Sequence, residues 1–188
     1  MKYIPLAGIG LCVWGLITLD WFYVVFGILM FAGGFIFDLF KKKGALADDK
    51  VFDTYKALHP LIRMIRTGLE ETDADASTPK VKLAEGLFYL GMVDAAGQSA
   101  DMDDAQFLSL FKATFADIDY DFDDSYQDKL MMYHQSIRTD ESAYRAIMEG
   151  GQQFVKLVGG NHTSLLTVVP LIHKLAEDSN FPSTVDDL

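Results

Sequence analysis

Two long apolar runs at the N-terminus constrain the fold of this chain more than any other feature. Residues 3–19 form a run of 17 residues without a charge, and residues 21–37 form a second run of 17. One helix through both runs would be about 50 Å long, whereas the hydrocarbon core of a bilayer is about 30 Å thick. The sequence therefore predicts a transmembrane hairpin in residues 1–43, with spans at about 3–19 and 21–40 and with Asp20 at the turn.

Lysines indicate the orientation of this hairpin. Lys41, Lys42 and Lys43 directly follow the second span, and Lys2 precedes the first. Positive charge near the ends of a span favours the cytoplasmic side, so both ends are predicted to be cytoplasmic. A cleaved signal peptide is the main alternative, but a small-x-small cleavage site is missing after Leu19 and a second apolar run follows.

The remaining residues, 44–188, are strongly acidic and are predicted to form a cytosolic domain. The chain has a formal net charge of −11, and residues 44–188 hold 12 of its 16 Lys and Arg against 25 of its 27 Asp and Glu, a charge of −13. Such a surface repels DNA and long RNA. The single cysteine, Cys12, lies in the apolar part, so the domain has neither a disulfide nor a cysteine nucleophile.

Apolar periodicity predicts an all-α fold for this domain. Large apolar residues recur every three or four positions over residues 49–71, where Pro60 is expected to kink or divide the helix. Further helices are predicted at 79–96, around 107–115, around 130–137 and at 163–177, with residues 178–188 as a polar tail. Short helices around 144–148 and 154–158 are expected to end at Gly150-Gly151 and Gly159-Gly160, because glycine commonly follows a helix C-terminus.

Known catalytic and metal-binding motifs give no match in this domain. The aspartates of residues 117–128 approach EF-hand spacing, but Phe122 takes the place of the required glycine and Asp128 that of the bidentate Glu, which favours a helix cap. The four histidines lack metal-ligand spacing. Because no P-loop, nucleophile elbow or dinucleotide fingerprint is present either, we expect no enzyme, no metal and no cofactor.

The segment GGNHTSLL, residues 159–166, is a candidate anion site. Two glycines precede four polar residues at the predicted start of a helix, where free backbone N–H groups can bind an anion. These candidate ligand-binding residues are Asn161, His162, Thr163 and Ser164. The alternative is that the glycines end one helix and that Asn161 or Thr163 caps the next.

A second group of candidates lies in residues 134–145. His134, Arg138, Tyr144 and Arg145 combine cationic and aromatic side chains, a mixture that suits phosphates and stacked bases. Arg63 and Arg66 also lie one turn apart on one helix face. The alternative is ordinary surface charge, in which each arginine pairs with one of the many carboxylates.

The layout of the chain, from MKYIPLAGIG to FDLFKKKG and then a helical remainder, resembles that of the small membrane effectors of type III CRISPR defence. That resemblance implies a bacterial inner-membrane protein whose cytosolic domain binds cyclic tetra-adenylate and whose spans then perturb the bilayer. A cyclic ligand with four phosphates suits a four-fold ring of subunits, each with one anion site. The implied partners are therefore a cyclic oligoadenylate, the lipid bilayer and further copies of the chain, in a tetramer.

A different class of function remains open from the same residues. The segment LFYLGMVDAAGQSADMDDAQFLSLF, residues 87–111, is similar to the helix–acidic turn–helix of TerB-like stress domains, although Gln98 stands where an acidic-glycine turn is expected. This similarity implies a membrane-anchored adaptor that binds a protein partner. A two-span anchor also fits an accessory subunit of a secretion or motor complex.

Overall fold

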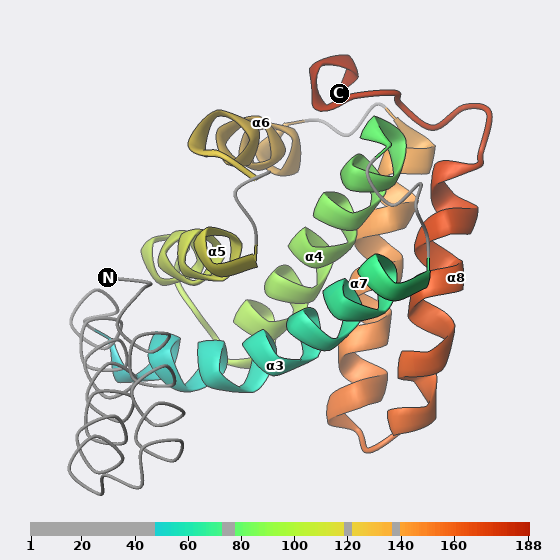
Figure 1. The fold of residues 1–188 in the computed structure, drawn as a ribbon. Coiled ribbons are helices and arrows are strands. Elements are labelled where there is room, and N and C mark those ends of the chain that lie inside the picture. Colours follow the sequence, from blue (N-terminus) through green and yellow to red (C-terminus); the bar gives the residue numbers. More distant parts are fainter. Residues whose placement is uncertain (1–47, 73–77, 119–121, 137–139) are drawn as a thin grey trace, which may run out of the picture. The chain divides into compact units, whose positions relative to one another are not determined.

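A computed structural model describes residues 48–72, 78–118, 122–136 and 140–188 (Figure 1). The chain divides into two units, Met1–Ala47 and Asp48–Leu188. The predicted transmembrane hairpin belongs to the first unit and lies outside the described residues. Among the helices that are described, none is both long and apolar enough to cross a bilayer.

The second unit is all-helical, which confirms the predicted fold class. No strand occurs in its described segments. Its six α-helices and two 3-10 helices follow in the order α3 (Asp49–Thr72), α4 (Pro79–Ser99), α5 (Asp104–Ile118), α6 (Asp124–Gln135), α7 (Glu141–Val158), η1 (His162–Ser164), α8 (Leu165–Ala176) and η2 (Val185–Asp187).

Polar side chains at the helix starts explain where several of these helices begin. The Thr78 hydroxyl accepts from the Val81 N–H before Pro79 opens α4, and the Asp103 carboxylate accepts from the Gln106 N–H before α5. The Asp123 carboxylate likewise accepts from the N–H of Tyr126 before α6. These bonds satisfy N–H groups that have no partner inside the helix. The cap interpretation of the aspartate-rich segment is thus confirmed for Asp123.

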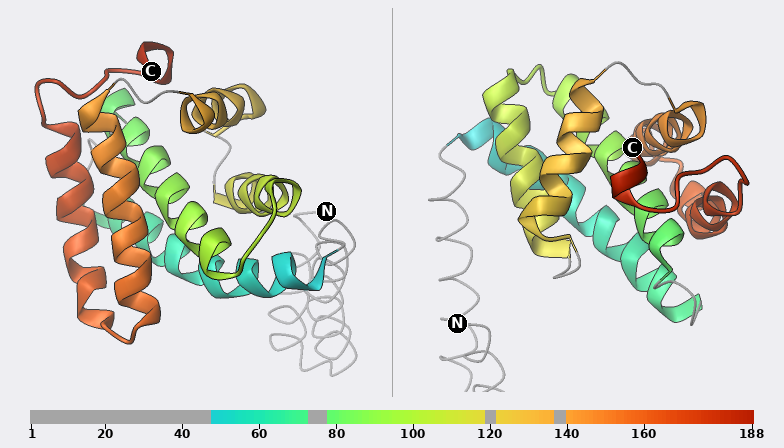
Figure 2. Two further views of the ribbon diagram at one scale, coloured as in Figure 1. Left: turned by 180° about the vertical axis from the view of Figure 1, so that it is seen from behind. Right: turned by 90° about the horizontal axis from the view of Figure 1, so that it is seen from above.

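Helix α4 lies at the centre of the core. Every residue from 83 to 93 is buried, so no face of this part of the helix reaches solvent. Figure 1 shows α7 and α8 on one side of α4 and α5 and α6 on the other, and Figure 2 shows the same arrangement from behind and from above. Helix α3 packs against α4, α5 and α8. A helix that is apolar all round is stable in water only when neighbours cover it in this way.

Three predicted elements differ from the structure. Helix α3 continues through Pro60, and Leu58 and Ile62 on either side are fully buried, so of the two predicted effects of Pro60, a kink or a division, the division does not occur. The short helices around 144–148 and 154–158 are one helix, α7, which contains Gly150 and Gly151. The polar tail is also wrong, because Phe181 is buried and Lys129 pairs with Asp186.

One buried ion pair links α3 to α4. The Arg66 guanidinium lies 2.7 Å from Glu85, whose side chain is 1% exposed, and 2.9 Å from Glu70 at the surface. Burial, and next the negative charge of Glu85, raises the pKa of the Tyr89 phenol well above its ordinary value. The same two causes raise the pKa of Tyr126. Arg66, which the sequence offered as part of a cationic face, is therefore engaged inside the protein.

Candidate interaction groove between α4 and α7

Helices α4 and α7 touch through their backbones where they cross. A Cβ atom added to Gly91 would lie 1.9 Å from the Ile147 carbonyl oxygen, and one added to Gly150 would lie 2.0 Å from that of Phe88. Non-bonded atoms do not approach so closely, so any side chain at either position would force the two helices apart. Glycine is required here for close approach, which explains why the Gly150-Gly151 pair lies inside a helix.

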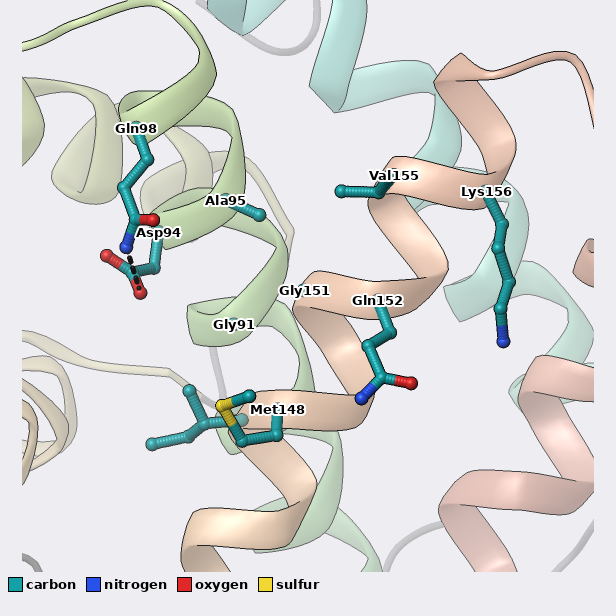
Figure 3. A pocket seen from close by; sticks show the side chains of 10 residues that line it. Gly91, Asp94, Ala95, Gln98, Met148, Gly151, Gln152, Val155 and Lys156 are labelled. Atoms are coloured by element: carbon teal, nitrogen blue, oxygen red, sulfur yellow. Dashed lines mark hydrogen bonds between the residues drawn. The ribbon is translucent and has the colours of Figure 1, made fainter.

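Beyond this crossing the two helices diverge toward their C-terminal ends and leave a groove. Figure 3 shows Gly91 and Gly151 near the crossing and Gln98 and Val155 farther apart on the separating ends. The groove has a volume of about 440 Å³. Its lining comprises Gly91, Asp94, Ala95 and Gln98 from α4 and Ile147, Met148, Gly151, Gln152, Val155 and Lys156 from α7.

The groove has a floor of small residues and one apolar wall, which α7 provides. Small residues, Gly91, Ala95 and Gly151, line its centre. On the α7 side, the Met148 and Val155 side chains are 43% and 60% exposed. Small residues allow another backbone to come close, and exposed large apolar side chains gain free energy when they are covered. The arrangement is suited to receiving a helix.

The outward face of α7 carries a regular stripe of residues beside the groove. The stripe consists of Tyr144, Met148, Gly151, Val155 and Val158, which are separated by alternating steps of four and three residues. Val158 is 65% exposed, and Tyr144 is half-buried. A spacing that averages 3.5 residues keeps one stripe directed at a partner helix, as in a coiled coil. We call this set the α7 stripe.

The two rims of the groove carry opposite charges. On the α4 rim, the Gln98 amide donates to the Asp94 carboxylate over 3.0 Å, and the His134 Nε2 atom lies 3.5 Å from the same carboxylate. On the α7 rim, Lys156 is exposed. Asp94 lies on the α4 side, and Lys156 extends from the side of α7 that faces away from α4, as Figure 3 shows.

The predicted anion site lies elsewhere, in the turn between α7 and α8. Gly160 adopts a φ of 89°, and the backbone N–H of Asn161 donates to the Lys156 carbonyl, which ends α7. The Thr163 hydroxyl donates to the Asn161 side chain over 2.7 Å, and the Ser164 hydroxyl donates to the Asn161 carbonyl over 2.8 Å. The predicted helix end at Gly159-Gly160 is confirmed. The side chains of Thr163 and Ser164 thus bond within the turn, His162 is exposed, and the Asn161 side chain makes no cap hydrogen bond to the helix start.

The described members of the second predicted group have separate surroundings. Arg138 lies outside the described residues. Arg145 lines a surface depression together with three carboxylates, those of Asp140, Glu141 and Asp178, which would repel a phosphate. His134 stacks on Phe107 with 5.3 Å between ring centres. Its role there is to pack α6 against α5.

Among the described members of the two predicted groups, those at the start of α7 and those after its end lie far apart within one chain. Arg145 and Tyr144 lie near the start of α7, whereas His162 follows its end, and the intervening helix is about 20 Å long. A cyclic oligoadenylate site built from both groups would need contributions from more than one copy. The ligand therefore stays a prediction. In the four described segments, no cluster of three His, Cys, Asp or Glu side chains is arranged to hold a metal ion.

Comparison of the chain with known protein families, with characterised proteins and with solved structures finds no match. The groove therefore has to be interpreted from its own geometry. Sequence reasoning missed it, because Gly150-Gly151 was interpreted as a helix end. The signal that was available is the α7 stripe, whose four-three spacing runs without interruption through both glycines.

Proposed function

We propose that this protein is a membrane-anchored helical interaction module. Residues 1–43 hold the chain in the bilayer as a two-span hairpin, and the domain that follows binds an amphipathic helix in the groove between α4 and α7. The uncharged runs at 3–19 and 21–37 and the lysines at 41–43 support the anchor. The groove supports the binding role.

A single observation carries the binding role: an exposed apolar wall on α7 stands beside a floor of small residues. Helix-in-groove recognition uses anchor residues spaced by three and four positions that enter an apolar groove. Met148 and Val155 are seven residues apart on one face of α7 and supply such anchors, while Gly91 and Ala95 leave room for the incoming backbone. A ligand with several phosphates suits this groove poorly, because Lys156 is its one cation and Asp94 opposes it.

A photo-crosslinking amino acid in place of Gln152 tests the groove in cells that produce the full chain. Gln152 is exposed and lines the groove, whereas Lys112 is exposed on α5 and serves as the matched control position. We expect a light-dependent adduct from position 152 and none from position 112. Val155→Glu should abolish the adduct, because a carboxylate in the apolar contact would lose its hydration.

The outcomes of this experiment separate clearly. An adduct at 152 that Val155→Glu removes supports docking in the groove. Equal adducts from both positions, or none from position 152, would rule out the groove as the binding surface.

Fractionation of the full chain tests the anchor. A two-span hairpin stays in the bilayer when peripheral proteins are stripped by alkaline carbonate, since its backbone polar groups are satisfied only inside the helices. We expect the protein in the membrane pellet after this wash. Release into the supernatant would contradict the anchor and leave the groove proposal standing.

A further inference from the structure

We propose that the helix which fills the groove is α7 of a second copy of this chain. The two α7 helices lie parallel and in register, about a two-fold axis that runs along them, and each α7 occupies the groove of the other copy. This inference rests on the proposed function and names its partner. Three features of the groove lead to it: the spacing of the α7 stripe, the position of Gly151, and the charges on the rims.

The spacing of the α7 stripe matches what a parallel helix pair requires. A surface helix that packs only on its own domain has one apolar face, which is directed toward the core. In α7 this face includes Ala146, Ile147 and Phe154. The α7 stripe is a second line beside that face: Met148, Val155 and Val158 are exposed, whereas Gly151 borders α4. In parallel pairs, positions of a 3.5-residue repeat meet their own equivalents across the axis. Met148 then meets Met148 and Val155 meets Val155.

Gly151 sits in the middle of this stripe and permits the approach. With the large residues Met148 and Val155 on either side, a glycine at the contact lets two helices pack closely along one turn. Its added Cβ would lie 3.3 Å from the Gly91 carbonyl, so Gly151 is less crowded inside the domain than Gly150. Gly151 also faces α4, since its added Cβ would lie 3.6 Å from the Ala95 Cβ, but it lines the floor of the groove and there leaves room for the partner's backbone.

The charged rims favour the parallel arrangement over the antiparallel one. A two-fold axis along the helices places the outer side of each α7 over the α4 rim of the other copy, so that Lys156 faces Asp94. An antiparallel pair would instead stack α4 on α4 and α7 on α7, which separates Asp94 from Lys156. Opposite charges that meet across an interface set its register and orientation.

Disulfide crosslinking of the full chain in membranes tests both the partner and the direction. In a Cys12→Ser background, Met148→Cys and Val158→Cys are made separately, with Lys112→Cys as the control for random collision. Positions 148 and 158 are about 15 Å apart along the helix, and a disulfide requires Cα atoms within about 7 Å. We expect Met148→Cys and Val158→Cys each to form crosslinked dimers and Lys112→Cys to form none.

Other results would overturn the proposal. In an antiparallel pair, equivalent residues of the two copies come together only close to the two-fold axis. A crosslink at position 148 or at position 158, but not at both, therefore refutes the parallel register. Crosslinks at neither position refute the second copy as partner. Crosslinking at Lys112→Cys to the same extent shows collision rather than an interface, and this too refutes the proposal.

Charge exchange provides a second, independent readout. In the Val158→Cys chain, Lys156→Asp should lower the crosslinked fraction several-fold, because it places Asp against Asp94. Adding Asp94→Lys should restore it. If the double variant stays low while circular dichroism shows a folded helix content, the two rims do not face each other across the axis and the proposed geometry is wrong.

The failure of this inference can be told apart from that of the proposed function. In the photo-crosslinking experiment at Gln152, an adduct of twice the mass of the chain agrees with a second copy. An adduct of another mass keeps the interaction module and removes the second copy. The absence of any adduct removes both.

Discussion

Helices α4 and α7 contact each other closely, yet they have opposite relations to solvent. Residues 83–93 of α4 are all buried, so the helix has no outward face along that stretch. Helix α7 buries one side, including Ile147 and Phe154, and exposes Met148, Val155 and Val158 on another. The difference shows that α4 organises the domain, whereas α7 both completes the core and presents a surface.

The α4–α7 pair is tightly packed in one part and open in another. At the crossing, glycine brings the backbones into contact and leaves no space. Toward the C-terminal ends, the helices separate and the groove opens. Tight packing in one half holds the angle between the helices, and that angle keeps the other half open. Substitutions at the crossing should therefore cost stability, and substitutions in the groove should cost binding.

The largest loss of stability is expected from Gly150→Ala. Its Cβ would lie 2.0 Å from the Phe88 carbonyl oxygen, so α4 and α7 must move apart, at a cost of more than about 3 kcal/mol in the free energy of unfolding. Gly151→Ala is the comparison at the adjacent position and should cost less, because its added Cβ would lie 3.3 Å from the nearest atom, the Gly91 carbonyl oxygen. Urea denaturation followed by circular dichroism measures both. Equal stabilities would show that the crossing is not closely packed.

A smaller loss is expected from Arg66→Met at the buried ion pair. This change leaves the Glu85 carboxylate buried without its cation, which costs up to about 3 kcal/mol, since Arg66 is itself 17% exposed and partly screened by water. Glu70→Gln, at a side chain 58% exposed, should cost less than about 1 kcal/mol. The same denaturation assay ranks them. If Glu70→Gln cost as much as Arg66→Met, the surface contact would matter as much as the buried one.

The smallest effect on stability at neutral pH is expected from the buried phenols of Tyr89 and Tyr126. Because the folded-state pKa values of Tyr89 and Tyr126 are raised, both remain protonated when an unfolded tyrosine ionises near pH 10. Their contribution to stability is thus complete below about pH 10 and declines as the pH rises further. Tyrosinate absorbance should show that these phenols ionise only as the domain unfolds, and Tyr89→Phe should reduce the alkaline loss. Ionisation of Tyr89 near pH 10 in the folded state would contradict this.

Local signals in the sequence placed much of the domain correctly. Apolar periodicity predicted α3 from residue 49 to 71, against the observed Asp49–Thr72, and the next helix was predicted to begin at Pro79, where α4 begins. The helix end at Gly159-Gly160 was also correct, since Gly160 takes a positive φ in the structure. These features depend only on residues that are close in the sequence, and periodicity and capping rules describe such residues.

Gly150 and Gly151 show what local signals cannot decide. The same dipeptide that ends α7 at 159–160 continues the helix at 150–151, because there α4 lies against it and occupies the space that side chains would need. Likewise, Phe181 is buried only because the C-terminal segment folds back over the domain. For the candidate site, the sequence offered polar residues near α7, and the structure separated them and opened an apolar groove instead.

The sequence by itself determined the helical class, the bounds of α3, the start of α4, the end of α7, the Asp123 cap and the acidic character of the domain, because each follows from the chemistry of adjacent residues. Only the tertiary structure decided which glycines are contacts and which are ends, which arginine is buried against Glu85, and which line of α7 remains exposed. Those outcomes depend on residues far apart in the chain that meet when the helices pack.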